Sequence, residues 1–252
     1  SLISLGIIVV LVIAVFARMI YESGAQGPLA TNSWLQTSSK AFSDAITLGR
    51  SDMLRTFSFA AIGAAICMVC APLWTFALHF SSGWRKSILF VILVLPLLVP
   101  SLCIAFGSIL VFNQPYLDQF YNSIMLPAML IAGRFMPIAV LICSNAFTEQ
   151  SSSIDASARL HQLSIAQRVY GIFARSNWRA CLLGGALVFV FAMRELDFAI
   201  LLPAANQSTA VRYYNALHFS RDNFVAAFGI TISLILFVPL MLRSWFRTNK
   251  VS

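Results

Sequence analysis

Six long apolar runs limit what this chain can fold into. They lie at about residues 2–20, 56–80, 87–112, 123–146, 180–203 and 223–242. A run of about 20 apolar residues crosses the hydrocarbon core of a bilayer as a helix. Lipid satisfies no backbone N–H or C=O group, and none of the runs alternates with a period of two, so we expect helices rather than barrel strands. The sequence predicts an all-α membrane protein with six transmembrane helices in a single domain, residues 1–252.

The overall composition agrees with a membrane protein and argues against a nucleic-acid partner. Only 10% of the residues are charged and 59% are apolar, whereas about 25% are charged in a typical soluble domain. The net charge is +8, but the Lys and Arg residues do not form a stripe with stacking aromatic residues. The chain begins inside an apolar run without an initiator Met, which indicates a processed or excised piece of a longer polypeptide.

The basic residues between the runs predict the orientation. If both ends of the segment are cytoplasmic, nine Lys or Arg residues lie inside and five lie outside, or six if Arg18 is counted. The inside set is Arg85, Lys86, Arg159, Arg168, Arg175, Arg179, Arg243, Arg247 and Lys250, and the outside set is Lys40, Arg50, Arg55, Arg212 and Arg221. Because basic residues favour the cytoplasmic side, we expect an outside loop at 21–55, with a surface helix within 34–46 as one option, and a cytoplasmic loop at 147–179.

The third run contains two prolines, in the stretch "LPLLVPS". Pro96 and Pro100 each remove a backbone donor, so we expect a kink or a break there. A broken helix at membrane depth is tolerated where it packs on protein or lines a cavity. The break could therefore serve packing or a transport pathway, and the sequence alone favours neither.

Charged residues occur within two of the runs. Arg194, Glu195 and Asp197 lie in the fifth run and Arg134 lies in the fourth. Since a lone charge in the membrane is costly, these residues are expected to pair or to line a polar pathway. Arg194 and Asp197 are spaced to pair on one helix face, which leaves Arg134 as the candidate partner of Glu195.

Other kinds of site find little support in the sequence. The three histidines are scattered, so no metal site is expected, and Cys67 and Cys70 lie in an apolar run where buried structural thiols are typical. There is no G-x-x-x-x-G-K-[ST] motif and no set of nucleophile and base. We therefore expect neither an enzyme nor a cofactor bound to this chain.

The cytoplasmic loop carries an amphipathic pattern, "SSSIDASARLHQLSIAQRVYGIF", at residues 151–173. Ser152 and Asp155 form a capping-box pattern that starts a helix, and Ser164 could divide that helix in two. Apolar residues recur at helical spacing, at Ile154, Ala158, Ile165, Val169 and Ile172. Such a helix either lies on the lipid surface or docks into a groove of a cytoplasmic partner, and both options are open from the pattern alone.

This loop resembles the cytoplasmic loop of permeases of ABC importers. The Glu-Ala-Ala of that family falls at Ala156, Ser157 and Ala158, and its glycine falls at Gln162. The segments "ILVLPLLVPSLCIAFG", "VFVFAMRELDFAILLP" and "STAVRYYNALHFSRDNFVAA" resemble the third span, the fifth span and the last outside loop of fused permeases of the ferric-iron and thiamine type. The similarity runs in order from about residue 55 to the end, as expected for one six-span half.

The resemblance implies a bacterial inner-membrane protein that works with several partners. These are a dimer of cytoplasmic ATPases that bind ATP and Mg²⁺, a second permease half or subunit, a periplasmic binding protein and membrane lipid. The ATPase-coupling residues would be Asp155, Ala156, Ser157, Ala158, Arg159, Leu160, His161, Gln162 and Ser164. Because Ala156 and Gln162 depart from the family pattern, we expect weak or asymmetric coupling by this half.

The transported substrate is expected to be ferric iron, with thiamine, a phosphonate or another small solute as alternatives. A transporter of another class, driven by coupled ions, would need carboxylates at mid-membrane. Glu195 and Asp197 meet that requirement, so an ion-coupled secondary transporter is the rival interpretation.

Overall fold

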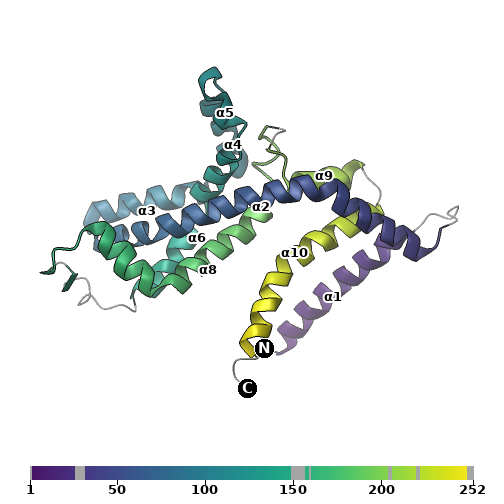
Figure 1. Cartoon of the computed structure of the whole chain (residues 1–252), viewed down its shortest axis with the longest axis horizontal. Coiled ribbons are helices and arrows are strands. Elements are labelled where there is room, and N and C mark those ends of the chain that lie inside the picture. Colours follow the sequence, from purple (N-terminus) through teal and green to yellow (C-terminus); the bar gives the residue numbers. More distant parts are fainter. Residues whose placement is uncertain are drawn as a thin grey trace. The chain divides into compact units, whose positions relative to one another are not determined.

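The computed structural model describes residues 2–25, 32–148, 157, 158, 160–203, 206–219 and 222–248, apart from the side chains of 2–5, 148 and 237–248. Every regular element in these residues is helical, as the sequence predicted (Figure 1). The elements are α1 (Leu2–Gly24), α2 (Trp34–Phe80), α3 (Gly83–Leu98), α4 (Ser101–Phe112), η1 (Pro115–Leu117), α5 (Asp118–Tyr121), α6 (Met125–Thr148), η2 (Gln167–Ala174), α8 (Trp178–Met193), α9 (Thr209–Phe219) and α10 (Asp222–Thr248).

Several of these helices are long and apolar enough to cross a membrane. Three qualify alone: Gly6–Gly24, Trp34–Phe80 and Met125–Phe147. The count rises to five if two bent pairs, α3 with α4 and η2 with α8, are each taken as one span. In α10 the apolar portion within the described side chains, Asp222–Leu236, is shorter. The structure thus supports three to five spans where the sequence predicted six.

The chain forms two compact units, and α2 contributes to both. The first unit contains Ser1–Leu54 and Thr209–Ser252, and the second contains Arg55–Ser208. In the first unit, small residues of α2 form a core with α10, composed of Ala41, Ala45, Ala227 and Phe228. Gly49 is part of this contact, since an added Cβ would lie 2.5 Å from the Phe228 ring. A buried Asp52 of α2 pairs with Arg212 of α9.

The predicted outside loop at 21–55 is mostly helical, because α1 continues to Gly24 and α2 begins at Trp34. The optional helix within 34–46 is thus present, but as the start of the much longer α2. A capping box starts α2: the Ser33 N–H donates to Gln36 Oε1 (3.1 Å), and the Gln36 N–H donates to Ser33 Oγ (3.3 Å). Two of the polar residues that suggested a loop, Ser38 and Asp52, are instead buried inside the first unit. Ser38, for example, hydrogen-bonds Ser23 of α1 through their hydroxyls at 2.9 Å.

The second unit is held together by small residues where α2, α6 and α8 meet. A Cβ added at Gly63 of α2 would lie 2.7 Å from Ile131 of α6, and one at Gly185 of α8 would lie 2.4 Å from Met68 of α2. The Cys67 thiol donates to the Ala132 carbonyl at 3.5 Å. Small residues allow helix backbones to approach closely, which is how helices associate where lipid removes the hydrophobic driving force.

The predicted fifth span, 180–203, is also wrong at its C-terminal end. Helix α8 ends at Met193, and residues 194–203 form a series of turns. The turns bury Phe198, Ala199 and Leu202 in the second unit. Non-helical backbone is tolerated at membrane depth only when protein covers it, and the burial of these three residues agrees with that requirement.

Candidate functional site

The break in the third apolar run lies at Val99 and Pro100, and it bends α3 and α4 by 100°. Pro100 has no N–H to donate, and it drives the residue before it away from helical backbone. Val99 accordingly takes an extended conformation, with φ −71° and ψ 133°. The break predicted at Pro100 is confirmed, whereas Pro96 lies inside α3 and does not end that helix. The break leaves the Val99 carbonyl outside the helical hydrogen-bond pattern.

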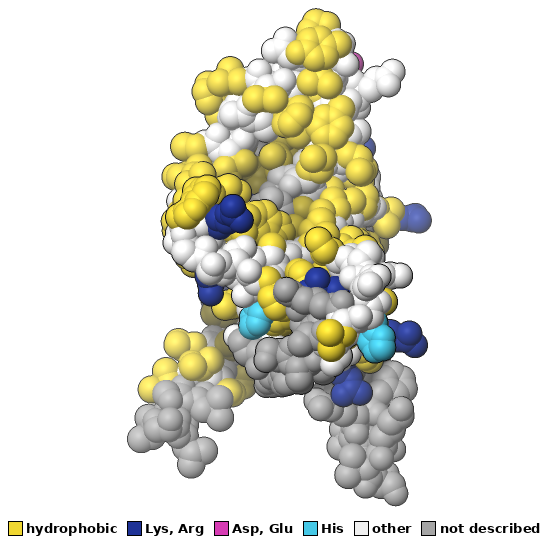
Figure 2. Space-filling model, turned by 90° about the vertical axis from the view of Figure 1, so that its left-hand side faces the viewer, with side chains coloured by type: hydrophobic (Ala, Val, Ile, Leu, Met, Phe, Trp, Pro, Cys, Tyr) yellow, Lys and Arg dark blue, Asp and Glu magenta, His cyan; other side chains and the backbone are white. Residues whose placement is uncertain are grey.

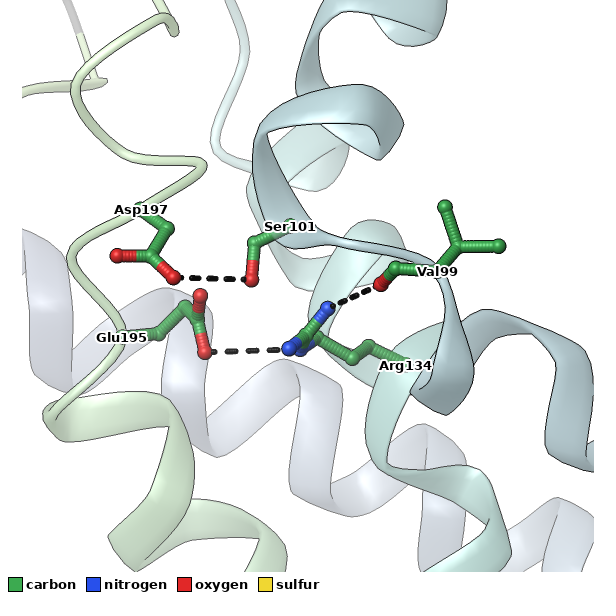
Figure 3. Close-up of polar contacts among 5 residues, drawn as sticks. All are labelled: Val99, Ser101, Arg134, Glu195 and Asp197. Carbon is green, nitrogen blue, oxygen red and sulfur yellow. Dashed lines mark hydrogen bonds and ion pairs between the residues drawn. The ribbon is translucent and has the colours of Figure 1, made fainter.

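Arg134 of α6 supplies a hydrogen-bond donor to the Val99 carbonyl, as Figure 3 shows. Its Nη1 donates to the Val99 carbonyl at 3.1 Å, and its Nε lies 3.7 Å from Oε2 of Glu195. The side chains of Arg134 and Glu195 are only 17% and 11% exposed. The predicted pairing of Arg134 with Glu195 is therefore confirmed.

The other predicted pair, Arg194 with Asp197, is wrong. The described residues contain no ion pair between them, because α8 ends at Met193 and the helical spacing of three residues no longer applies. Asp197 instead accepts a hydrogen bond from Ser101 at the start of α4, with 3.3 Å between Ser101 Oγ and Asp197 Oδ2. Arg194 is exposed.

Five residues therefore form one polar cluster, which joins the α3–α4 break, α6 and the turns after α8: Val99, Ser101, Arg134, Glu195 and Asp197 (Figure 3). Sequence reasoning missed Val99 and Ser101. A serine directly after a predicted break was the available signal, since its hydroxyl sits at a new helix start. With one cation against two carboxylates, the cluster can hold three elements together or present a polar surface to a solute. Among the described residues, no group of three or more His, Cys, Asp or Glu side chains could hold a metal.

The segment predicted to be a cytoplasmic loop contains two helical pieces with a sharp turn between them. Residues 157, 158 and 160 are helical, and Gln162 then takes a left-handed backbone with φ 54°. The Leu163 N–H donates back to the Ala158 carbonyl at 3.2 Å, which is the six-to-one bond of a Schellman helix end. Glycine is the usual residue at the left-handed position of that motif.

The second piece begins at Ser164, where the sequence predicted a possible division. The Ser164 N–H donates to Gln167 Oε1 at 2.8 Å, and the Gln167 N–H donates to Ser164 Oγ at 3.3 Å. This capping box opens a helix over residues 165–176, here called the loop helix, whose central part η2 is wound as a π-helix. A bend of 92° separates η2 from α8.

The predicted coupling residues fall into three groups. Asp155, Ala156 and Arg159 lie outside the described residues, as do Ser152 and Ile154 of the predicted pattern. Ala158 is buried, whereas Leu160 is 84% exposed. The remaining members are exposed as well, namely Ser157, His161, Gln162 and Ser164.

The predicted apolar stripe holds only in part. Val169 is buried, but Ile165, in the first turn of the same helix, is 61% exposed. Figure 2 shows Lys, Arg and His side chains gathered at this end of the molecule, below a surface that is mostly hydrophobic. The loop thus presents isolated apolar side chains among basic and polar ones.

No protein-family model and no curated protein matches this chain. The polar cluster and the two-piece loop are therefore the features from which its function has to be inferred.

Proposed function

We propose that this chain is a transmembrane permease subunit, or one half of a permease, of an ATP-driven ABC importer. The observation that carries the proposal is the left-handed backbone of Gln162. In the resemblance, Gln162 falls where the family has its glycine, and glycine is the residue that takes this backbone without steric cost. Glutamine has no preference for a left-handed backbone, so the turn at Gln162 does not come from the residue itself. Its presence at the aligned position therefore supports the alignment independently of residue identity.

The exposed face of the loop supports a docking role. Leu160 and Ile165 flank the turn and are exposed to 84% and 61%. Apolar side chains presented by short helices are typical anchors for a groove on a partner. We propose that a cytoplasmic ATPase, which binds ATP and Mg²⁺, receives this face, and that a periplasmic binding protein delivers the substrate to the opposite side.

The polar cluster supports transport rather than catalysis. It holds a broken helix to two other elements, and a broken helix at membrane depth is tolerated where it packs on protein or lines a cavity. In this proposal the substrate is ferric iron, and thiamine, a phosphonate or another small solute remain alternatives. The cluster argues against an ion-coupled secondary transporter, because Glu195 faces Arg134 and Asp197 faces Ser101, so both carboxylates already have partners.

A substitution on the exposed face tests the proposal. Leu160→Asp should abolish co-purification of an ATPase subunit with the tagged chain from its native host, and it should abolish ATP hydrolysis by the purified complex. Tyr116→Asp is the matched control, since Tyr116 is similarly exposed, at 81%, and lies between α4 and α5. Equal ATPase binding by both variants, or an absence of any ATPase from the wild-type complex, would contradict the proposal.

The sidedness can be tested in a variant without its five cysteines. Single cysteines introduced at Leu160 and at Tyr116 should react with a membrane-impermeant maleimide from opposite sides of the membrane, with position 160 labelled from the cytoplasm. Labelling of position 160 from the periplasm would contradict both the orientation and the docking role.

A further inference from the structure

The inner face of the loop helix meets a group of aromatic rings that the proposed docking role does not use. Phe76, His79 and Phe80 stand at the end of α2, and Phe147 stands near the end of α6. The ring centroids of His79 and Phe147 are 4.4 Å apart, and those of Phe76 and Phe80 are 4.6 Å apart. The rings of His79 and Phe147 meet edge to face, with their planes at 69°, and those of Phe76 and Phe80 are tilted at 52°; rings at such distances and angles attract each other.

The loop helix inserts its own ring into this group. Phe173 lies 4.5 Å from Phe147, centroid to centroid, with the ring planes at 74°. Phe173 and Val169 are both buried. The loop helix therefore has a fixed contact with α6 through aromatic packing, in addition to its covalent connection to α8.

Arg168 connects the loop helix to α2. Its guanidinium carbon lies 4.8 Å from the centroid of the Phe76 ring and 5.7 Å from that of Phe80. A guanidinium within about 6 Å of a ring centroid is attracted by the negative face of the ring. Tyr170 adds a second contact to the same helix, since its hydroxyl donates to the Val69 carbonyl at 3.1 Å.

The contacts to α2 are spaced along that helix. Val69 and Phe76 are seven residues apart, about two helical turns. A helix held at two points two turns apart cannot pivot freely on its partner, so a push on the loop helix is passed to α2 as a displacement. The contact between Phe173 and Phe147 passes the same push to α6, which carries Arg134 of the polar cluster.

We propose that Arg168 is a positioning residue for transport: with Phe76, Phe80, Phe147 and Phe173 it forms a joint that transmits movement of the loop helix to α2 and α6. This inference rests on the proposed function, because the movement is supplied by the ATPase. The exposed face of the loop binds the ATPase, and the joint on the inner face moves the spans. Loss of the joint should therefore separate ATP hydrolysis from movement without releasing the ATPase.

The test compares three substitutions in the purified complex with its ATPase. Arg168→Met keeps the length and the apolar stem but removes the cation, whereas Arg168→Lys keeps a cation. Arg175→Met is the matched control, because Arg175 is an exposed arginine at the end of the same helix. Spin labels at Ala166→Cys, an exposed position of the loop helix outside the proposed ATPase anchors, and at Tyr116→Cys report whether movement of the loop reaches the far side. The readout is the change in the distance between the two labels upon trapping with ATP and vanadate.

We expect Arg168→Met to retain the bound ATPase and ATP hydrolysis but to reduce the population of the moved state roughly fivefold. Arg168→Lys should restore most of it, and Arg175→Met should behave as the wild type. Phe76→Leu should reproduce the defect, and the double variant with Arg168→Met should be no worse than either single variant.

The outcomes separate the two levels of inference. If the wild-type chain binds no ATPase, the proposed function fails. If the wild type binds the ATPase and shows the distance change, and Arg168→Met shows the same change, the inference about the joint fails alone. A fall in the thermal unfolding midpoint of Arg168→Met that Lys does not reverse would indicate a purely structural role and would also overturn the inference.

Discussion

The two bends of the second unit reach nearly the same angle by different physical means. Helices α3 and α4 bend by 100° and η2 and α8 bend by 92°. The first bend is imposed by Pro100, and the carbonyl of Val99 at this bend accepts a hydrogen bond from the partly buried Arg134. The second bend has no proline: Asn177 lies at the corner, and its backbone N–H and its Nδ2 both donate to the Phe173 carbonyl, at 3.0 and 3.1 Å.

This difference indicates which bend is fixed and which can move. Straightening the first bend would bring Pro100 into the interior of a helix, where it is strongly unfavourable, and would break the hydrogen bonds of Val99 with Arg134 and of Ser101 with Asp197. The second bend is held by hydrogen bonds and by ring contacts that can rearrange without leaving a buried charge unpaired. We therefore expect the α3–α4 bend to stay constant during transport and the bend at Asn177 to change.

The largest effect is expected from removing the arginine of the first bend. Arg134→Leu leaves Glu195 as a buried charge without its partner and the Val99 carbonyl without its donor. Breaking a buried pair in this way costs about 3–5 kcal/mol. The measurement is the free energy of unfolding in mixed micelles, with the amount of membrane-inserted protein as a second readout.

Charge reversal is the control for this prediction. Arg134→Glu and Glu195→Arg should each be poorly inserted, and the two together should recover part of the loss if the pair is what matters. A double variant as poor as either single one would show that the loss comes from the Val99 contact or from packing instead.

The next effect concerns the proline of the first bend. Pro100→Ala restores a backbone donor and removes a residue that is about 3 kcal/mol less favourable than Ala inside a helix, so the bend should open. Spin labels at Lys86 and Asn113, which are both exposed, would then lie farther apart. Pro72→Ala is the control, since Pro72 lies inside the unbroken α2, and it should leave that distance unchanged.

A smaller effect is expected at the second bend. Asn177→Ala removes the side-chain donor to the Phe173 carbonyl but leaves the backbone donor in place. The loss should be about 1 kcal/mol and should appear as faster hydrogen exchange of the loop helix. Ser176→Ala, at an exposed neighbouring position, should not change that exchange. Protection equal to the wild type in Asn177→Ala would mean that the aromatic contacts alone hold this bend.

The smallest effect is a gain. Gln162→Gly relieves a left-handed backbone that costs an L-residue about 1–2 kcal/mol, offset in part by the greater freedom of glycine in the unfolded chain. We expect slower exchange of the amides around the turn, whereas Gln167→Gly, which loses the capping box of the loop helix, should speed it. The double variant Ala156→Glu, Gln162→Gly should also bind the ATPase more tightly. Unaltered ATPase binding by this variant would contradict the hypothesis that this half couples weakly.

The two bends also show how far sequence reasoning reaches. Pro100 and Ser164 are local signals. The break between α3 and α4 was predicted from Pro100, and the division of the amphipathic segment 151–173 was predicted from Ser164. The pairing of Arg134 with Glu195 followed from the cost of burying a charge, although the end of α8 at Met193 did not. Asn177 gave no signal, because an asparagine at a corner is recognised only when the carbonyl that it binds is known.

The continuity of α2 from Trp34 to Phe80 was missed for a related reason, since its start was predicted only as an optional short helix within 34–46. Its N-terminal half is rich in polar residues, which indicate a loop if no partner is known. Asp52 is buried by Arg212, about 160 positions away in the sequence, and Ala45 by Phe228. Contacts between residues so distant in the chain leave no periodic pattern within a short window. The helix in the N-terminal half of α2 is stabilised by these contacts and could not be predicted from the local sequence.

Helix α6 connects Arg134 with Phe147, and Pro137 between them removes one backbone hydrogen bond without ending the helix. Arg134 and Phe147 lie on one continuous helix, about 20 Å apart along its axis at a rise of 1.5 Å per residue. The same helix therefore carries Arg134, which contacts Val99 and Glu195, and Phe147, which contacts Phe173 of the loop helix. A rotation or translation of the helix at Phe147 is either absorbed by local distortion of α6 or reaches Arg134. There it would strain the hydrogen bond to the Val99 carbonyl and the ion pair with Glu195.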